Sequence, residues 1–350
     1  MSETAMTQDG RLKIIGNTGS PYTRKMLALL RYRHIPYDLI WADPKAWLPE
    51  QGIEAPRPTL LPVLLFPAEA GAIKAECDST PLIRKLESQY EGRSVLPDDP
   101  ALAFLDYLLE DFGDEWCTKY MFHYRWHFEK DADNAGTLLP LGLVPSMPTG
   151  AHQQFKEIIA QRQIERLYVV GSNDVTAPVI DASYRRFLKA MDTLLEEQPF
   201  LLGNRPGAGD FSIYGQLTQL IGFDPTPRAI AHVIAPRTVG WVSCMEDHTG
   251  LNGDEAQWCS SEAIPAGLKG LLTEMGRGYV PTLLANAKAV EAGEKNWETE
   301  IDGLPWTQQT FPYQAKCLRW INEQYHGLGE ADRARVDAAL SGTGCEALIV

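Results

Sequence analysis

The sequence predicts an α/β unit over about 90 residues, followed by a helical region. Short apolar runs rich in β-branched residues recur between residues 12 and 75, which is typical of strands. Helix-start signals separate some of these runs. From Asp98 onward, apolar residues recur at helical spacing instead. A chain of 350 residues with 44% apolar composition is long enough to bury a sizeable core in one or two domains.

The first strand is predicted over Leu12–Gly16. Ser20 and Pro21 then form a helix start, because serine is a favoured N-cap and proline fits the first helical position. Pro36 marks the end of that helix, and Tyr37–Trp41 is predicted as the second strand. The predicted order is therefore strand, helix, strand.

Residues 43–59 contain four prolines and no clear period, so we expect a loop with at most short helices. Pro62–Phe66 and Ala72–Ala75 flank turn residues and are predicted as a β-hairpin. Asp78 and Ser79 are candidate caps for the helix that follows. The second half of the unit therefore reads strand, strand, helix.

The remaining chain is predicted to be helical, with residues 136–150 as a linker or surface loop because they hold three prolines and three glycines. The expected helices cover residues 101–128, 152–170, 181–197, 210–222, 228–247, 262–275, 307–325 and 330–341.

Charge and cysteine usage exclude several classes of protein. The chain has 32 basic and 46 acidic residues, a net charge of −14, which argues against binding to nucleic acid or to anionic membranes. No apolar run approaches the roughly 20 residues of a spanning helix, and no apolar signal segment is visible near residue 1. The six cysteines form no CxxC pair. We therefore expect a cytoplasmic protein with reduced thiols.

Four segments, in this order, resemble motifs of the cytosolic glutathione S-transferase superfamily, of the bacterial type. They are Gly19–Lys25 with its Ser-Pro-Tyr turn, Leu61–Leu64 with its central proline, Asp78–Glu87 with its Asp-Ser start, and Gly203–Leu217. In the last segment Gly207 stands where the family has the serine or threonine of a capping box. Asp210, at the third helical position, retains half of that box.

The resemblance implies an N-terminal thioredoxin-like domain over 1–92 (βαβ-ββα). It further implies an all-helical transferase domain over 98–350 that carries the second-substrate pocket, with a C-terminal extension after about residue 250. The implied activity is glutathione transfer to an electrophilic, apolar small molecule, a detoxification reaction with glutathione as co-substrate and no metal. A homodimer is the implied assembly. The alternatives are a glutathione-dependent lyase, dehalogenase or isomerase on the same site, or a non-catalytic binding protein.

Ser20 is the predicted catalytic residue. A hydroxyl at a helix N-terminus lies beside unpaired N–H groups and the positive end of the helix dipole, which favours a thiolate. Ser20 as a simple helix cap is the alternative, and nearby residues could instead activate the thiol: Asn17, Thr18, Tyr22 and Thr23. The resemblance assigns glutathione binding to Tyr22, Leu61, Pro62, Val63, Asp78 and Ser79, with Pro62 in the cis form. Lys45 and Arg57 are candidates for the glycyl carboxylate.

Other clusters have competing interpretations. His123 and His127 have metal-ligand spacing, but no accompanying ExxH, so a structural role is favoured. Glu110, Asp111, Asp114 and Glu115 are expected to form an ion-paired or solvated face rather than a metal site.

Residues 120–126 hold four aromatic side chains, which either line the second-substrate pocket or pack in the core: Tyr120, Phe122, Tyr124 and Trp126. The aromatic and basic stretch Pro312–Ile321 either reaches over the active site or packs structurally.

Overall fold

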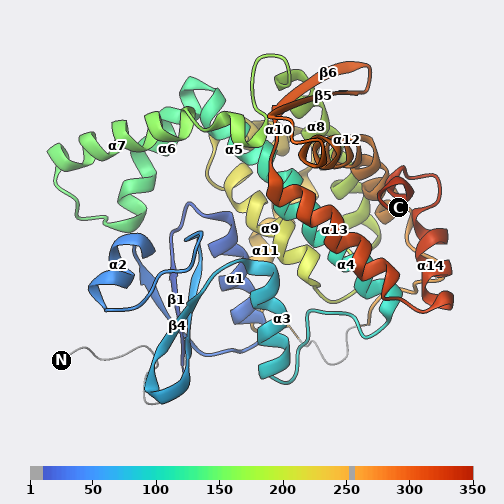
Figure 1. The fold of residues 1–350 in the computed structure, drawn as a ribbon, viewed down its shortest axis with the longest axis horizontal. Coiled ribbons are helices and arrows are strands. Elements are labelled where there is room, and N and C mark those ends of the chain that lie inside the picture. The colour runs from blue at the N-terminus through green and yellow to red at the C-terminus, as the bar shows by residue number, and fades with distance from the viewer. Residues whose placement is uncertain (1–10, 252–256, 350) are drawn as a thin grey trace.

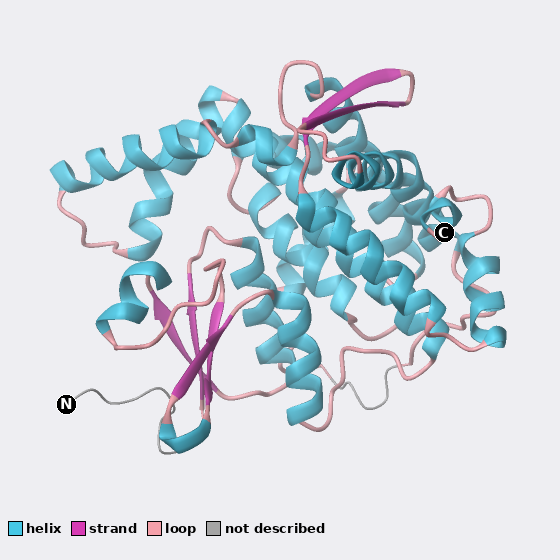
Figure 2. Cartoon of the chain, in the orientation of Figure 1, coloured by secondary structure: helices cyan, strands magenta, loops and turns pink. Residues whose placement is uncertain are grey.

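The computed structural model describes residues 11–251 and 257–349. Within these ranges, one part of the molecule is a four-stranded sheet with its helices, and the other is a larger helical body (Figures 1 and 2). The two parts lie side by side and share the largest cluster of buried apolar side chains. Two helices of the first part lie between its sheet and the helical body (Figure 1).

The first part is a thioredoxin-like domain, as predicted. The strands are β1 (Leu12–Gly16), β2 (Tyr37–Trp41), β3 (Val63–Pro67) and β4 (Ile73–Glu76), and the helices are α1 (Pro21–Tyr32), α2 (Pro44–Glu50) and α3 (Ser79–Gln89). The sheet order is β2-β1-β3-β4, with β2 parallel to β1 and the other neighbours antiparallel. Successive strand residues face opposite sides: Ile14 and Leu64 pack with α1 and α3, whereas Ile15 packs with α2.

Helix α1 begins where its sequence predicts. Ser20 is the N-cap, and its Oγ accepts a hydrogen bond from the backbone N–H of Thr23 at 3.2 Å. Pro21 occupies the first helical position. Met26 and Leu30 are on the buried face. Local capping therefore explains where this helix begins, and burial of nine of its twelve residues stabilises it.

The second part is mainly helical. Its helices are α4 (Pro100–Phe112), α5 (Thr118–His127), α6 (Glu129–Leu143), α7 (Thr149–Ile164), α8 (Ala177–Glu197), α9 (Ala208–Leu220), α10 (Pro225–Ile234), α11 (Pro236–Met245), α12 (Ala266–Glu291), α13 (Pro312–His326) and α14 (Glu330–Leu340). A π-helical turn, Gly113–Cys117, joins α4 to α5. Each helix in the described ranges is too short or too polar to cross a bilayer.

The predicted loop over residues 136–150 is wrong. Helix α6 continues to Leu143 and α7 starts at Thr149, so only residues 144–148 connect them. Pro140 is accommodated within α6, and Pro148 is the N-cap of α7. Gly136 lets α6 approach α7, because a Cβ there would lie 3.2 Å from Lys156 Cγ. The two helices pack on each other and project from the body on the side of α2 (Figure 1).

The prediction that residues 98–350 are all-helical is wrong at one hairpin. Strands β5 (Asn296–Ile301) and β6 (Leu304–Gln309) pair around Asp302 and Gly303, both of which have positive φ. The predicted helix over 307–325 therefore starts later, at Pro312. An Asp-Gly pair between two short strands is a strong signal of a hairpin. We missed it because this part of the chain was interpreted from helical spacing alone.

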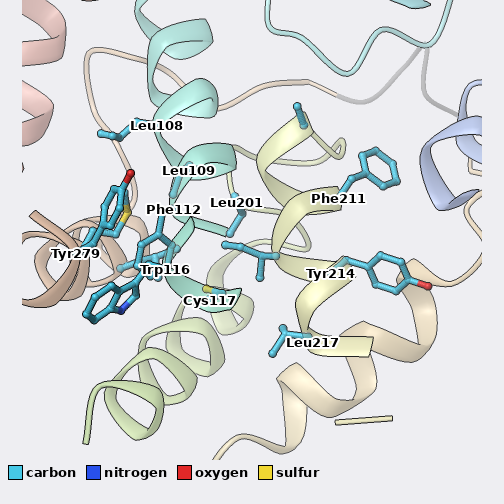
Figure 3. Close-up of a cluster of buried hydrophobic side chains, with 14 of the residues drawn as sticks. Leu108, Leu109, Phe112, Trp116, Cys117, Leu201, Phe211, Tyr214, Leu217 and Tyr279 are labelled. Carbon is cyan, nitrogen blue, oxygen red and sulfur yellow. The ribbon is translucent and has the colours of Figure 1, made fainter. Parts of the chain in front are cut away.

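Two other helix boundaries differ from prediction. The segment 228–247 is two helices, because Pro236 begins α11 directly after Ala235 ends α10. Helix α12 continues sixteen residues past the predicted end at 275, to Glu291, and tolerates Pro281 in its interior. Burial of the Tyr279 face against Phe112 and Trp116 outweighs that proline (Figure 3).

The start of α9 shows how a missing cap is replaced. Gly207 is the N-cap and has no side chain to accept from the first N–H groups of the helix. Asp106 of α4 supplies that acceptor: its two oxygens accept from the N–H groups of Ala208 at 3.2 Å and Gly209 at 3.0 Å. Asp210 completes the predicted half box by accepting from the N–H of Gly207 at 2.9 Å. A Cβ at Gly207 would lie 2.3 Å from Asp106 Oδ1, so glycine is required here.

This arrangement predicts that substitutions at Gly207 and Asp106 have non-additive effects on the free energy of unfolding. Gly207→Ser should lower the free energy of unfolding by about 1–3 kcal/mol, although serine is the usual cap, because it collides with Asp106. Asp106→Ala should cost about 2–4 kcal/mol by leaving two buried N–H groups without an acceptor. The double variant should cost at least about 1 kcal/mol less than the sum, because the serine can then cap the helix. Urea unfolding measures all three, and strictly additive losses would contradict this account.

Candidate functional site

The strand registers bring the predicted site segments to one end of the sheet. Ile15, near the end of β1, pairs with Val63 at the start of antiparallel β3. Leu64 pairs with Glu76 at the end of β4. The turn after β1, the segment before β3 and the turn after β4 therefore meet at the same edge. These are the segments that hold Ser20, Leu61–Pro62 and Asp78.

The turn that carries Ser20 is held from both sides. Within the turn, Asn17 accepts from the N–H of Gly19 at 2.9 Å through its side chain and from the N–H of Ser20 at 3.0 Å through its carbonyl. From α5, Arg125 donates to the carbonyl of Gly19 at 3.0 Å. From α9, the Gln219 amide donates to the carbonyl of Thr18 at 3.3 Å. The hydroxyl proton of Ser20 has no acceptor among the described residues.

Most of the alternative thiol-activating side chains already have structural partners. The Asn17 side chain accepts within the turn. The Thr23 side chain is buried and accepts from the N–H of Asn17 at 3.4 Å. The Tyr22 hydroxyl donates to the carbonyl oxygen of Asp114 at 2.8 Å, and burial raises the pKa of this phenol. Tyr22 was predicted to contact glutathione, but its ring lies in the domain interface. Ser20 and Thr18 keep uncommitted hydroxyl donors.

The segment before β3 has the predicted backbone geometry. The Leu61–Pro62 peptide bond is cis, as the motif implied, and Arg57–Pro58 is also cis. Neither the N–H nor the C=O of Leu61 has a hydrogen-bond partner in the described part of the chain. The Val63 side chain is fully buried with Ile15 and belongs to the core. Leu61 is therefore the residue of this segment that presents free backbone groups.

The turn after β4 combines a strained aspartate with a buried serine. Asp78 has φ 81° and ψ 109°, a conformation that costs a non-glycine residue free energy and recurs at functional sites. It is the N-cap of α3, but its side chain does not cap the helix. Instead, the Tyr313 hydroxyl of α13 donates to Asp78 Oδ2 at 2.9 Å. The stretch 312–321 thus reaches the predicted site, and Tyr313 is a site neighbour that sequence analysis did not single out.

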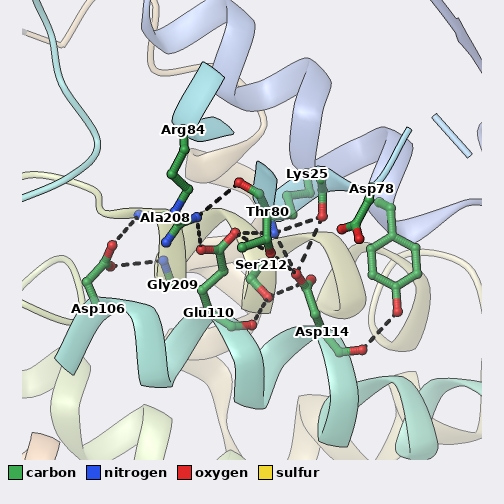
Figure 4. A network of polar contacts seen from close by, with 12 residues as sticks. Lys25, Asp78, Thr80, Arg84, Asp106, Glu110, Asp114, Ala208, Gly209 and Ser212 are labelled. Atoms are coloured by element: carbon green, nitrogen blue, oxygen red, sulfur yellow. Dashed lines mark hydrogen bonds and ion pairs between the residues drawn. The ribbon is translucent and has the colours of Figure 1, made fainter. Parts of the chain in front are cut away.

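Ser79 contacts a cluster of charges between the two domains. Figure 4 shows its members Lys25, Arg84, Glu110 and Asp114. Lys25 Nζ, which is fully buried, donates to Glu110 and Asp114 at 2.7 Å each and to the hydroxyl of Ser79 at 3.0 Å. Arg84 donates to the second oxygen of Glu110. Burial opposes ionisation of Glu110, but Arg84 and Lys25 outweigh it and hold its pKa at about 2. Lys25 and the two carboxylates are thereby paired away from water, and the half-buried Arg84 completes the cluster.

Two family models match the chain. The model described as "Glutathione S-transferase, N-terminal domain" matches residues 15–94, and "Glutathione S-transferase, C-terminal domain" matches residues 163–251. The first range contains the Ser20 turn, the cis proline and Asp78, and the second contains the Asp210 segment. The chain belongs to the glutathione S-transferase superfamily.

Several solved structures match this chain at low sequence identity. FzlA from C. crescentus is 15% identical, with 68% of this chain and 89% of that chain covered and a TM-score of 0.42. A glutathione S-transferase from Rhodospirillum rubrum F11 is 16% identical, with coverage of 75% and 92% and a TM-score of 0.41. A family member from Pseudomonas fluorescens pf-5, with two glutathione bound, is 14% identical, with coverage of 73% and 100% and a TM-score of 0.45. Membership rests on the family models, because these likenesses are too low to add to it. The comparison with curated proteins gave no match.

Several contacts to the glutathione S-transferase motifs come from outside both matched ranges. Residues 95–162 supply Glu110, Asp114 and Arg125, and residues 252–350 supply Tyr313. Arg125 is buried and forms a salt bridge with Asp224 at 2.9 Å while it holds the Gly19 carbonyl. Sequence analysis missed Arg125, because its buried partners are about a hundred positions away in the chain.

In the acidic set on α4 and the π-helical turn, Glu110 and Asp114 are buried, Asp111 and Glu115 are half-buried, and all four have partners. The set is therefore ion-paired or hydrogen-bonded, and it is not a solvated face. Tyr279 donates to Asp111, and the Gln314 amide donates to Glu115 at 3.1 Å. Burial, with neighbouring carboxylates, raises the pKa of Asp111 to about 7 and that of Glu115 to about 8. No group of three or more His, Cys, Asp or Glu side chains in the described ranges is arranged to hold a metal ion.

The histidine pair has a structural environment. The His123 and His127 rings are stacked 4.6 Å apart. Nδ1 of His123 is 2.7 Å from the hydroxyl of Ser172. Burial and the neighbouring His127 lower the pKa of His123 to about 3. The favoured structural interpretation of this pair agrees with these contacts.

The aromatic residues of α5 divide between two packing clusters. Tyr120 and Tyr124 are buried against Tyr184 of α8, so they are core residues. Trp126 and Phe122 pack with α6 and α7. Helix α6 contacts the Ser20 turn itself, since a Cβ at Gly19 would lie 2.0 Å from Leu139 Cδ2. Leu139 of α6 therefore lies against the Ser20 turn, whereas the four aromatic side chains of α5 pack with other helices.

The buried cluster predicts a large difference between two lysine substitutions. Lys25→Met should lower the free energy of unfolding by about 3–5 kcal/mol, because two carboxylates stay buried without their ammonium. Lys156→Met removes the ammonium from a pair with the exposed Asp133 and should cost less than about 1 kcal/mol. Chemical denaturation at neutral pH compares the two. Similar losses would show that the cluster stabilises the fold no more than a surface pair does.

Proposed function

We propose that this protein is a glutathione transferase that binds glutathione at the end of the sheet and activates its thiol for attack on an electrophilic, apolar small molecule. The observation that carries the proposal is Ser20. Its Oγ caps α1 by accepting from Thr23, which leaves its proton to donate to a ligand. The free backbone of Leu61 and the Asp78 turn lie at the same edge of the sheet.

The chemistry at Ser20 follows from its position. The thiolate is the nucleophile, so any group that favours it over the thiol raises the fraction that reacts. A hydroxyl donor and the positive end of a helix dipole both favour the charged form. The thiol proton leaves to solvent, and the thiolate sulfur then forms a bond to the electrophilic carbon of the second substrate. In a substitution, the bond from that carbon to its leaving group breaks and the leaving group departs with the electron pair. In an addition to an activated double bond, the π bond breaks and the neighbouring carbon takes a proton from solvent.

The rest of the tripeptide is assigned to the remaining motif residues. The N–H and C=O of Leu61 pair with the cysteinyl backbone, with Pro62 and Val63 holding that segment in place. Asp78 accepts from the γ-glutamyl ammonium, and the backbone N–H of Ser79, at the first turn of α3, donates to the γ-glutamyl carboxylate. Tyr22 contributes its backbone N–H near the start of α1. Lys45 and Arg57 are both exposed at this edge and are the candidates for the glycyl carboxylate.

A cytoplasmic homodimer completes the proposal. None of the six cysteines, all in described residues, forms a disulfide, which suits a reducing compartment. Helices α13 and α14 pack on α4, so a dimer has to use a surface that these helices leave open. Sedimentation at micromolar concentration tests this, and a single species with the mass of one chain would refute the dimer.

Calorimetric titration of the whole protein with glutathione tests the proposed ligand, and the ultraviolet absorbance of the bound thiolate tests activation. Binding with a lowered thiol pKa supports a transferase or a lyase, dehalogenase or isomerase on the same site. Binding without a thiolate signal supports a non-catalytic binding protein. Absence of binding overturns the proposal.

Ser20→Ala should reduce turnover far more than it weakens glutathione binding, because the backbone and Asp78 contacts are untouched. A hydrogen bond to a charged group contributes about 1.5–3 kcal/mol, and one pKa unit corresponds to about 1.36 kcal/mol. The pKa of the bound thiol should therefore rise by about one to two units. An ultraviolet titration of bound glutathione measures it, and Ser20→Thr, which keeps a hydroxyl, serves as the control. An unchanged thiol pKa would reduce Ser20 to a helix cap and make Thr18 the next candidate.

A further inference from the structure

The part of the chain beyond the family matches reaches the proposed glutathione site through one side chain, Tyr313. Its phenol, at the start of α13, donates to Asp78 Oδ2 at 2.9 Å. Asp78 Oδ1 has no hydrogen-bond partner among the residues that the structure describes. The carboxylate therefore has one oxygen held by the extension and one available to a ligand.

The position of Tyr313 is fixed by the extension itself. Asn286 of α12, fully buried, clamps the backbone of Phe311: its amide donates to the Phe311 carbonyl at 2.9 Å and its oxygen accepts from the Phe311 N–H at 2.8 Å. On the other side, Gln314 donates to Glu115 at 3.1 Å. The ring of Trp320 packs edge-on to the Tyr313 ring at 5.9 Å. The phenol is thus directed at Asp78 by contacts on both sides of it.

Asp78 needs such a partner. Its backbone is in a region that non-glycine residues rarely occupy, at φ 81°, and its side chain makes no cap bond to α3 that would orient it. Ser79, the next residue, is held by Lys25. Without Tyr313, no described side chain would fix the rotamer of the carboxylate at the end of the site.

We propose that Tyr313 is a positioning and specificity-determining residue of the co-substrate site. It holds Asp78 so that Oδ1 accepts from the ammonium of an α-amino-acid head group, and it thereby selects thiols that carry such a group. This inference rests on the proposed function, because it assigns the γ-glutamyl end of glutathione to Asp78. In this arrangement the C-terminal extension is part of the site.

The test compares two thiols on the full-length protein: glutathione, and the same tripeptide without its α-amino group, glutaryl-cysteinyl-glycine. Tyr313→Phe should weaken glutathione binding about tenfold in calorimetric titration and leave the affinity for the analogue unchanged. The thiolate absorbance of bound glutathione should not change, because Ser20 is untouched. Asp78→Asn should show the same ligand selectivity, and the double variant should lose no more than Asp78→Asn alone.

Tyr325→Phe is the matched control. Tyr325 is on the same helix and donates to another aspartate, Asp337, at 2.7 Å, but at the opposite end of α13. It should change neither affinity. Equal losses for both thiols, or unchanged or tighter glutathione binding in Tyr313→Phe, would overturn the role of Tyr313. If the wild type binds neither thiol, the proposed function itself fails and this inference fails with it.

Discussion

A buried ammonium at the junction of the two domains constrains the rest of the structure. Lys25 is in α1, the helix whose N-cap is Ser20, and its carboxylate partners Glu110 and Asp114 are in α4 and the π-helical turn. An unpaired charge in the interior is strongly unfavourable. Helix α1 therefore cannot move away from α4 without breaking both ion pairs. Close packing adds to this constraint, since a Cβ at Gly215 of α9 would lie 2.5 Å from the carbonyl of Pro21.

This constraint makes the proposed site a product of three regions of the chain. The thioredoxin-like domain supplies the motif residues at the end of its sheet. The helical domain anchors the Ser20 turn through Arg125 and Gln219. The extension holds Asp78 through Tyr313. Residues that contact no ligand themselves thus determine the geometry of those that would.

Sequence patterns predicted features whose signals lie within a few residues, and they missed most features that depend on contacts between distant residues. The four strands of the thioredoxin-like domain, the Ser20 cap and the half box at Asp210 have signals within a few residues of sequence, and those patterns predicted them. The acceptor that replaces the cap at Gly207 comes from Asp106, about a hundred positions earlier. The hairpin around Asp302 and Gly303 was missed although its turn signal is local. The helices of residues 136–150 were missed because packing of α6 on α7 outweighed a composition rich in proline and glycine.

By itself, the sequence determined the strands and helices of the first domain and the position of Ser20 at a helix start. These depend on backbone conformation and on periodic burial, which neighbouring residues encode. Its four motifs indicated the superfamily, and the cis form of Pro62 followed from that resemblance. Only the tertiary structure decided which side chains remain free to meet a ligand. It engages the hydroxyls of Tyr22 and Thr23 in contacts within the protein, and it leaves the hydroxyl proton of Ser20 without a described acceptor. It also brings Tyr313 to Asp78, 235 residues away in the chain. Tertiary packing determines which residues so distant in sequence become hydrogen-bond partners, and a local sequence pattern does not predict them.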